Sequence, residues 1–378
     1  MIYLDNAATS WPKPGDVYET ADRVFREFSG NPGRSGHRLS LAAGRYIEET
    51  RGLLGRLFNV PPETLCFTLN ATDALNLALK GLLKPGDHVV TGSMEHNAVA
   101  RPLEALRQRG ISCAKIPVSP IDGADPEEVR AALTRRTRLV VFSHVSNVTG
   151  TENPIAEISR ICREEGVLFL VDAAQSAGSL PLDLQALGVD LLAFPGHKGL
   201  LGPQGTGGLY IRPGLILQPL REGGAGSRSE DLNPPPAGPD RYESGTQNTA
   251  GLAALGEGVR WLLAQGLEVV ARREALLASR LLEGLEGIPG LTLYGPPAGE
   301  RRRGVVSINL EGMDCAQGGI ILDNAFDIAV RSGLHCAPDA HRTLGTLAVG
   351  GTLRISLGSL TTEADIDACL DALSRLSR

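Results

Sequence analysis

The stretch "VLFLVDAAQ", Val167–Gln175, is an apolar run that ends in an aspartate. Such an unbroken run is typical of a strand that is covered on both faces of a sheet. Similar runs occur at five other places, namely 64–69, 88–91, 112–118, 138–145 and 191–194. Segments with helical periodicity separate them, at 72–83, 98–109, 126–133 and 155–165. This alternation predicts an α/β domain with a mostly parallel, doubly wound sheet.

The C-terminal part of the chain has a different pattern. Two long amphipathic segments precede strand patterns in "VVSINL" and "TLRISLG" and a last helix near 362–376. We expect a large α/β domain over 13–255 and a smaller α+β domain over 256–378, joined by an N-terminal segment, 1–12. The segment 221–245 is rich in glycine and proline and indicates a linker or a loop that lines a site.

The composition excludes several classes of protein. The formal net charge of the 378 residues is −6 and no basic run occurs, which argues against a nucleic-acid or membrane surface. No apolar run approaches the ~18 residues of a membrane span, and "MIYLDNAATS" lacks the features of a signal peptide. We therefore expect a cytoplasmic protein. The six cysteines form no CxxC motif, so we expect free thiols and no metal site.

The stretch "FPGHKGLLGPQGTGG", 194–208, places one lysine among glycines. The glycines at 202–207 do not have the dinucleotide-binding spacing, and no P-loop sequence occurs. An isolated lysine is ordinarily a surface charge, but Lys198 follows the apolar run 191–194, which brings it to the same sheet edge as Asp172. A partly desolvated lysine forms a Schiff base with an aldehyde readily. A carboxylate can hold a pyridinium nitrogen protonated, although Asp172 is equally suited to cap a helix.

Two further stretches fit the same chemistry. In "NATDALNLAL" a strand gives way to a helix, so the backbone N–H groups of Ala71, Thr72 and Asp73 suit a phosphate monoester. Thr72 is also an ordinary helix cap. In "MEHNAVARP" His96 follows the next strand, where an imidazole can stack on a flat ring or serve a structural role. The order of these groups along the chain favours an enzyme that uses pyridoxal phosphate (PLP).

These motifs, with "YLDNAAT", "GHKGLLGP", "ESGTQN" and "VRSGLHCAP", resemble the class V aminotransferases of PLP fold type I over nearly the whole chain. Within that family the chain is similar to the cysteine desulfurases. The resemblance implies that Lys198 forms the internal aldimine with PLP and that Asp172 pairs with the ring nitrogen. It also implies that Gln175 bonds the phenolic oxygen and that His96 stacks on the ring.

The resemblance also assigns the phosphate and the quaternary structure. It implies that Thr72, Asp73 and His197 bind the phosphate. Gly245 and Thr246 of "ESGTQN" resemble a segment that reaches the phosphate of the partner subunit, which implies a homodimer. Proteins of this group often carry a serine where this chain has Pro195, and proline offers neither a hydroxyl nor an N–H.

Substrate binding is implied in the same way. Arg354 in "TLRISLG" resembles the arginine that grips the substrate carboxylate, where its planar fork gives two parallel bonds. Its apolar neighbours Leu353 and Ile355 predict a partly buried position. Asn147 in "SHVSNVTGT" resembles a residue that contacts the substrate and the ring.

Cys336 decides between a desulfurase and a plain transaminase. The segment "RSGLHCAPDA" predicts a short exposed loop, in which Arg331 and His335 flank the thiol and favour a thiolate. The form "RxGxHCA" resembles the second desulfurase group, which includes selenocysteine lyases. We therefore expect conversion of L-cysteine to L-alanine with a persulfide on Cys336, and a possible sulfur-acceptor protein as partner.

Several alternatives stay open at this point. A selenocysteine lyase or a cysteine-sulfinate desulfinase would have the same scaffold. In a true class V aminotransferase Cys336 would be structural. A non-enzymatic scaffold would leave the joint presence of Lys198, Asp172, His96 and Arg354 without a reason.

Overall fold

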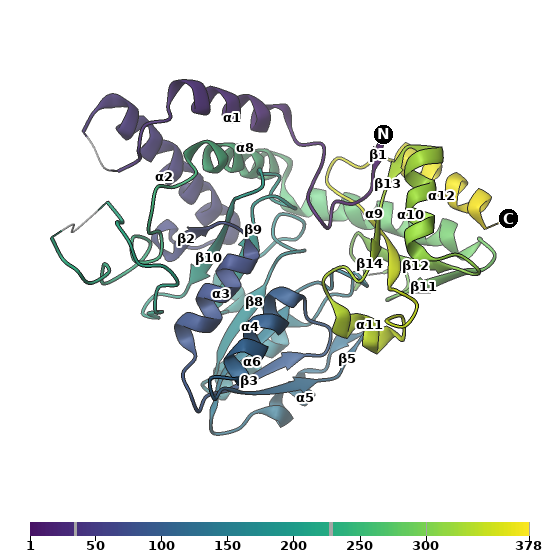
Figure 1. The fold of residues 1–378 in the computed structure, drawn as a ribbon, viewed down its shortest axis with the longest axis horizontal. Coiled ribbons are helices and arrows are strands. Elements are labelled where there is room, and N and C mark those ends of the chain that lie inside the picture. The colour runs from purple at the N-terminus through teal and green to yellow at the C-terminus, as the bar shows by residue number, and fades with distance from the viewer. Residues whose placement is uncertain (34–35, 227–229, 300, 378) are drawn as a thin grey trace.

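The computed structural model describes residues 1–33, 36–226, 230–299 and 301–377 (Figure 1). The large domain contains a seven-stranded sheet with the strand order β2-β10-β9-β8-β7-β3-β4. Only β10 runs antiparallel to its neighbours among these strands. The strands are β2 (Leu65–Thr68), β3 (His88–Gly92), β4 (Ser112–Ile116), β7 (Thr137–Ser143), β8 (Leu168–Asp172), β9 (Leu191–Pro195) and β10 (Gly207–Ile211). The mostly parallel sheet predicted from the sequence is confirmed.

Helices cover both faces of this sheet, because successive strand residues bury their side chains on opposite sides. In β3, Val89 packs in one hydrophobic cluster and Val90 in the other. The helices with the Val89 cluster are α3 (Ala71–Leu82) and α4 (Asn97–Arg107). Those with the Val90 cluster are α2 (Arg38–Phe58), α5 (Pro126–Ala132), α6 (Ile155–Glu164), α7 (Leu184–Leu187) and α8 (Thr249–Gln265). Helices thus pack on both faces of the sheet, as in a doubly wound α/β fold.

Three shorter elements and one outer helix complete the large domain. They are α1 (Gly15–Glu27), which packs on α8, the 3-10 helix η1 (Pro62–Thr64), and the hairpin of β5 (Val118–Ser119) and β6 (Gly123–Ala124). No helix or strand occurs in the described part of the predicted loop 221–245, of which residues 227–229 lie outside the described residues.

The small domain has a four-stranded antiparallel sheet in the order β11-β12-β15-β14. Its strands are β11 (Leu291–Tyr294), β12 (Val305–Leu310), β14 (Arg331–Gly333) and β15 (Thr352–Ser356). Its helices are α10 (Cys315–Phe326), α11 (Pro338–Leu344) and α12 (Glu363–Leu376). The N-terminal strand β1 (Ile2–Tyr3) joins this domain by pairing in parallel with β13 (Ile328–Ala329). The predicted α+β pattern therefore appears in the fold.

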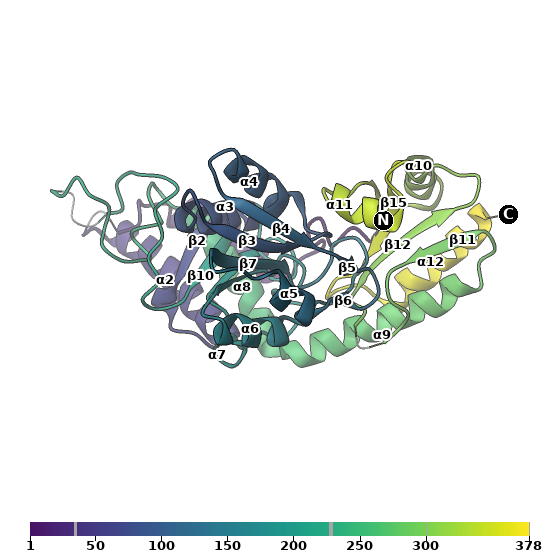
Figure 2. The same cartoon turned by 90° about the horizontal axis from the view of Figure 1, so that it is seen from below.

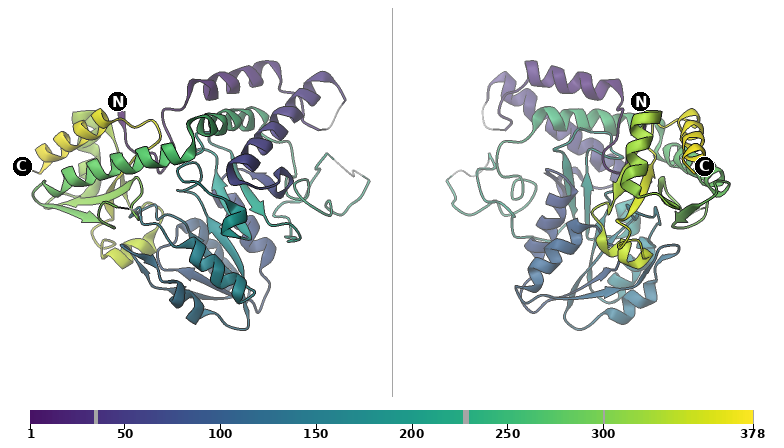
Figure 3. Two further views of the ribbon diagram at one scale, coloured as in Figure 1. Left: turned by 180° about the vertical axis from the view of Figure 1, so that it is seen from behind. Right: turned by 45° about the vertical axis from the view of Figure 1, so that its right-hand side comes forward.

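Helix α9 (Leu267–Glu286) runs from the large domain to the small one, as Figures 2 and 3 show. Its Val270 belongs to a large-domain hydrophobic cluster, whereas Leu277 packs in the small-domain core together with Leu4. The expected boundary at residue 255 would cut α8, which packs on α1 and α2. We propose a division within α9 in its place, with the first four residues, 267–270, counted to the large domain.

Among the described residues, no helix is long and apolar enough to cross a membrane. The same residues contain no group of three or more histidine, cysteine, aspartate or glutamate side chains that could hold a metal ion.

Candidate active site

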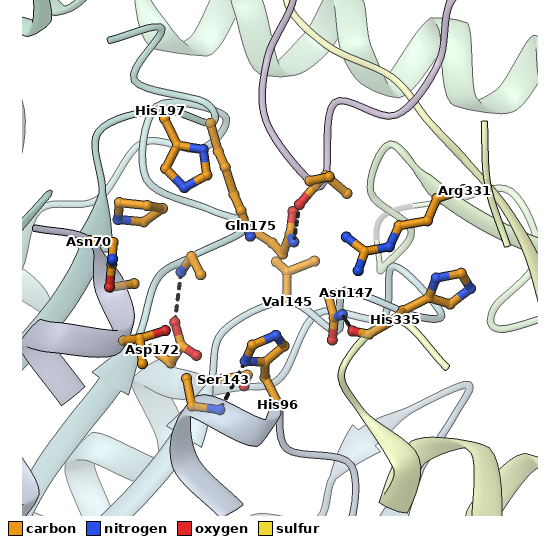
Figure 4. Close-up of a pocket in the computed structure, with 18 of the residues that line it drawn as sticks. Asn70, His96, Ser143, Val145, Asn147, Asp172, Gln175, His197, Arg331 and His335 are labelled. Atoms are coloured by element: carbon orange, nitrogen blue, oxygen red, sulfur yellow. Dashed lines mark hydrogen bonds between the residues drawn. The ribbon is translucent and has the colours of Figure 1, made fainter. Parts of the chain in front are cut away.

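A cavity of about 270 Å³ lies between the two domains, at the C-terminal ends of β7, β8 and β9. Figure 4 shows Arg331 and His335 of the small domain on one side and Asp172 of the large domain on the other. The cavity is lined by nine residues singled out in the sequence, namely Ala71, Thr72, His96, Asn147, Asp172, Gln175, His197, Lys198 and Arg354. Segments as distant in sequence as β15 and α3 therefore meet at one site, and its large-domain part lies at the carboxyl ends of the parallel strands, where the sequence placed it.

Asp172 is the last residue of β8 and is only 3% exposed. Its Oδ1 accepts a hydrogen bond of 2.9 Å from the N–H of Ala174. Burial raises the pKa of Asp172, while the Ala174 N–H and the nearby Lys198 act against that rise. A buried carboxylate of this kind stabilises a positively charged partner in the cavity.

Lys198 follows β9 in the tight glycine-rich turn, where the N–H of Leu201 donates to its carbonyl over 2.9 Å. Burial lowers the pKa of Lys198 to about 8, and the cation of Arg354 lowers it further, against the attraction of Asp172. An amine that loses its proton near neutral pH is a competent nucleophile and base. The lone lysine of the glycine-rich stretch is thus placed for chemistry.

Two histidines of the cavity are neutral near pH 7. His96 caps α4, because its Nδ1 accepts the N–H of Ala98 at 3.0 Å. Burial lowers the pKa of His96 to about 4. Burial and the nearby positive charge of Lys198 likewise lower the pKa of His197 to about 4. The Nδ1 atom of His197 is buried and has no hydrogen-bond partner among the described residues. A bound group with a polar atom at this point would satisfy that nitrogen.

The N-terminus of α3 requires a correction to the prediction for Asp73. Asn70 is the true cap, since its Oδ1 accepts the N–H of Asp73 at 2.9 Å. The Asp73 carboxylate accepts hydrogen bonds from the N–H of Leu69 at 3.1 Å and from Nη2 of Arg221 at 2.9 Å. Asp73 does not line the cavity, because both its N–H and its carboxylate are used locally, whereas Asn70, Ala71 and Thr72 do.

Arg354 in β15 is 1% exposed, in agreement with the burial that its apolar neighbours predict. Its Nη2 donates to Asp5 Oδ1 at 2.8 Å and its Nη1 to the backbone carbonyl of Asn147 at 3.1 Å. Its Nε is buried without a partner in the described parts of the chain. Burial lowers the pKa of Arg354, and the pairing with Asp5 opposes this change. The free donors suit an incoming carboxylate.

The side-chain amides of Asn147 and Gln175 are engaged with the backbone. Asn147 Nδ2 donates to the carbonyl of His335 at 2.7 Å, and Gln175 Nε2 donates to the carbonyl of Ala7 at 3.0 Å. The amide oxygen of each side chain can still accept a hydrogen bond from a bound group.

Cys336 is exposed and lies in a turn between β14 and α11. The predicted exposed position of the thiol is therefore confirmed, although Arg331 just before it belongs to a strand. Arg331 Nη2 lies 3.8 Å from Cys336 Sγ. Cys336 itself is not among the residues that line the cavity, whereas Arg331 and His335 are. The thiol thus stands at the rim of the cavity, in contact with the Arg331 guanidinium.

Gly245 and Thr246 do not line this cavity. They border a separate hollow of about 210 Å³, together with Arg221 and Glu243. A role for these two residues in the site of a partner subunit therefore stays a prediction.

Sequence reasoning missed several residues of the site. Asp5, which holds Arg354, and Ala7, which receives Gln175, belong to the quoted motif "YLDNAAT", so that motif was the available signal. Glu95 accepts both the N–H and the hydroxyl of the cavity residue Ser143, the latter at 2.6 Å. No pattern in one sequence shows such a buried pair.

The residues present fit PLP. The cavity combines a lysine of lowered pKa, a buried carboxylate and a neutral imidazole with an unsatisfied histidine nitrogen near the start of α3. These are the groups that an aldehyde, a pyridinium nitrogen, a flat ring and a phosphate require.

Comparison with known proteins gives a consistent result. The model of the family "Aminotransferase class-V" matches residues 2–369. A probable cysteine desulfurase from Methanothermobacter thermautotrophicus is 35% identical over 100% of this chain and 94% of its own length. A cysteine desulfurase from Escherichia coli is also 35% identical, with the same coverage.

Solved structures agree with these relatives. The apo structure of a cysteine desulfurase from Thermococcus onnurineus NA1 superposes with a TM-score of 0.92, at 32% identity, over 100% of this chain and 94% of that one. A cysteine desulfurase from Escherichia coli superposes with a TM-score of 0.89, at 28% identity, over 99% and 94% of the two chains.

Proposed function

Because the chain belongs to the class V aminotransferase family, we propose that it is a PLP-dependent cysteine desulfurase. The reaction converts L-cysteine to L-alanine and leaves the sulfur as a persulfide on Cys336. One observation carries the proposal: an exposed thiol stands beside Arg331 at the rim of a cavity that holds Lys198 and Asp172. The names of the full-length relatives support the same activity.

The cofactor contacts follow from the cavity. Lys198 would bind the aldehyde, Asp172 the ring nitrogen and Gln175 the phenolic oxygen, with His96 against the ring. The backbone of Ala71, the hydroxyl of Thr72 and the free Nδ1 of His197 would receive the phosphate, to which Pro195 adds no donor. When bound, PLP supplies an electron sink for the negative charge that develops at the substrate Cα.

The protein side chains divide the remaining work. Arg354 binds the substrate carboxylate through its free N–H groups, and Asn147 lies beside it. The Nζ of Lys198 takes the Cα proton, because its pKa of about 8 leaves a neutral amine available near neutral pH. The Cys336 thiolate attacks the substrate sulfur: a sulfur–sulfur bond forms as the carbon–sulfur bond breaks. The electron pair of that bond stays on carbon and takes a proton to give alanine.

A homodimer is part of the proposal. Large apolar side chains are exposed on α1 and α2, including Phe25 at 73% and Leu41 at 52%. Several exposed large apolar side chains on neighbouring helices indicate a surface that another chain covers. Gly245 and Thr246 would then reach the phosphate of the partner subunit.

The exposure of Cys336 also supports transfer of the persulfide to an acceptor protein. All six cysteines are free thiols, which is in keeping with the proposed cytoplasmic location. Selenocysteine lyase and cysteine-sulfinate desulfinase remain the alternatives. Alanine release from L-cysteine, selenocysteine and cysteine sulfinate under the same conditions separates the three.

Detection of the persulfide tests the proposal. After incubation with L-cysteine, peptide mass spectrometry should find one added sulfur on the Cys336 peptide, and none on Cys113, the half-buried thiol that serves as internal control. Alanine release without sulfur on Cys336 would contradict the desulfurase mechanism. Accumulation of the pyridoxamine form in place of alanine would favour transamination.

A further inference from the structure

The turn that carries Cys336 has an unusual backbone. His335 has a φ of 49° and Cys336 a φ of 57°, so two successive residues with side chains are left-handed. The N–H of Ala337 closes the turn on the carbonyl of Leu334 at 2.8 Å. Positive φ at both central residues is the form of a type I′ turn, which favours glycine and asparagine. Neither His335 nor Cys336 prefers this form, so other contacts must hold it.

Both carbonyls of the strained pair are bonded to the large domain. The N–H of Asn97, the first residue of α4, donates to the Cys336 carbonyl at 2.8 Å. The side chain of Asn147 donates to the His335 carbonyl at 2.7 Å. Just after the turn, Ala337 and Ala340 are fully buried in the hydrophobic core of the large domain. The turn thus belongs to the small domain in sequence, whereas the large domain holds it in place.

Asn147 also connects the turn to the carboxylate-binding group. Its backbone carbonyl accepts Arg354 Nη1 at 3.1 Å, while its side chain holds His335. Asn147 thus contacts both the thiol turn and the guanidinium and contributes to the spacing between them. For a substrate bound by its carboxylate, that spacing decides whether its sulfur meets Cys336 Sγ.

We propose that Asn97 and Asn147 are positioning residues for Cys336. Their two hydrogen bonds keep the His335–Cys336 turn left-handed and hold the thiol where the substrate sulfur arrives, as long as the two domains are together. The proposal rests on the proposed desulfurase function, which it deepens. The competing explanation is that the small domain holds the turn alone, through its own hydrogen bond and the contact of His335 Nε2 with Thr352 Oγ1 at 3.0 Å.

The position of Asn97 permits a selective test. Proline is well tolerated at the first residue of a helix, where the N–H has no intrahelical partner. The preceding His96 has a φ of −65° and a ψ of 153°, which suits a residue before proline. Asn97→Pro therefore removes the N–H that holds Cys336 and leaves α4 intact. Asn97→Ala is the matched control, because it removes the side chain and keeps the N–H.

Two readouts follow the turn and its function separately. The first is amide hydrogen exchange of Ala337 in the apo protein, which reports opening of the turn without any turnover. We expect Asn97→Pro to speed this exchange roughly two- to tenfold, the effect of one hydrogen bond. The second is the rate of persulfide formation on Cys336 in the holoenzyme. We expect it to fall about 10- to 100-fold, while L-cysteine binding, followed by the cofactor absorbance, stays within a factor of about two.

Wild-type behaviour of Asn97→Pro in both readouts would overturn the proposal, and so would an equal effect of Asn97→Ala. If Asn97→Pro does not fold, Asn147→Ala with the exchange measurement decides in the same way. Failure of the desulfurase assignment looks different: wild-type protein would then form no persulfide, whereas the exchange at Ala337 would still report on the two hydrogen bonds.

Discussion

The free donors of Arg354 allow a quantitative prediction for Arg354→Lys. A guanidinium has five N–H groups. Asp5 and the Asn147 carbonyl take two of them, so three remain and a carboxylate can accept two. A lysine has three N–H groups, and at the same contacts at most one would be left for the substrate.

The expected loss is therefore at least one charge-assisted hydrogen bond in a site that is 1% exposed. Such a bond contributes about 1.5–3 kcal/mol. This corresponds to L-cysteine binding that is weaker by about 10- to 150-fold. The rate of the chemical steps at saturation should change much less, because Lys198 and Cys336 are untouched.

Binding is measured from the cofactor absorbance for L-cysteine and for cysteamine, which lacks the carboxylate. The variant should lose affinity for L-cysteine and keep its affinity for cysteamine. Arg331→Lys serves as the matched control, since Arg331 lines the same cavity but contacts Cys336. An equal loss for both ligands, or no loss, would refute the assignment of Arg354 to the carboxylate.

Three other predictions concern the thiol, the lysine and the fold. Cys336→Ala should lower alanine release from L-cysteine at least about 100-fold and leave the absorbance change on substrate addition intact; full turnover would show that the thiol is structural. In the apo protein, acylation of Lys198 should rise with pH through about 8, because burial lowers its pKa and an amine gains reactivity as it loses its proton. With an ordinary pKa only about 0.3% of the amine would be neutral at pH 8, so a midpoint near 10 would exclude the buried setting. Arg51→Ala should lower the free energy of urea unfolding by about 3–5 kcal/mol, because it leaves Glu243 buried without its partner. Arg280→Ala, which breaks an exposed ion pair, is the control and should have a much smaller effect; similar effects of the two would contradict the burial argument.

Much of the large domain was predictable because its strands are buried on both faces. Runs such as Leu168–Asp172 have to be apolar throughout, and the polar residue at their end is then conspicuous. The strand β10, Gly207–Ile211, escaped prediction because its glycines continue a glycine-rich loop. Those glycines are needed where the strand lies against Phe194 and Asn70, since a Cβ at Gly207 would lie 2.7 Å from Asn70 Cα.

The site was predictable where its residues stand at the ends of strands, as Asp172 and Lys198 do. It was not predictable where function depends on tertiary pairing. Asp73 lies in the first turn of α3, where a phosphate ligand was expected, but its hydrogen bonds with Arg221 and Asn70 hold it outside the cavity lining. The two hydrogen bonds to the Cys336 turn join segments far apart in the chain. Nothing in the sequence around Asn97 indicates that its N–H donates to the carbonyl of Cys336.

Borohydride reduction of the holoenzyme, followed by peptide mass spectrometry, tests the central claim most directly, since the whole account depends on Lys198 as the residue that binds the cofactor aldehyde. The account predicts a pyridoxyl group on the peptide that contains Lys198 and on none of the other lysine peptides. A label on another lysine, or no label at all, would contradict it.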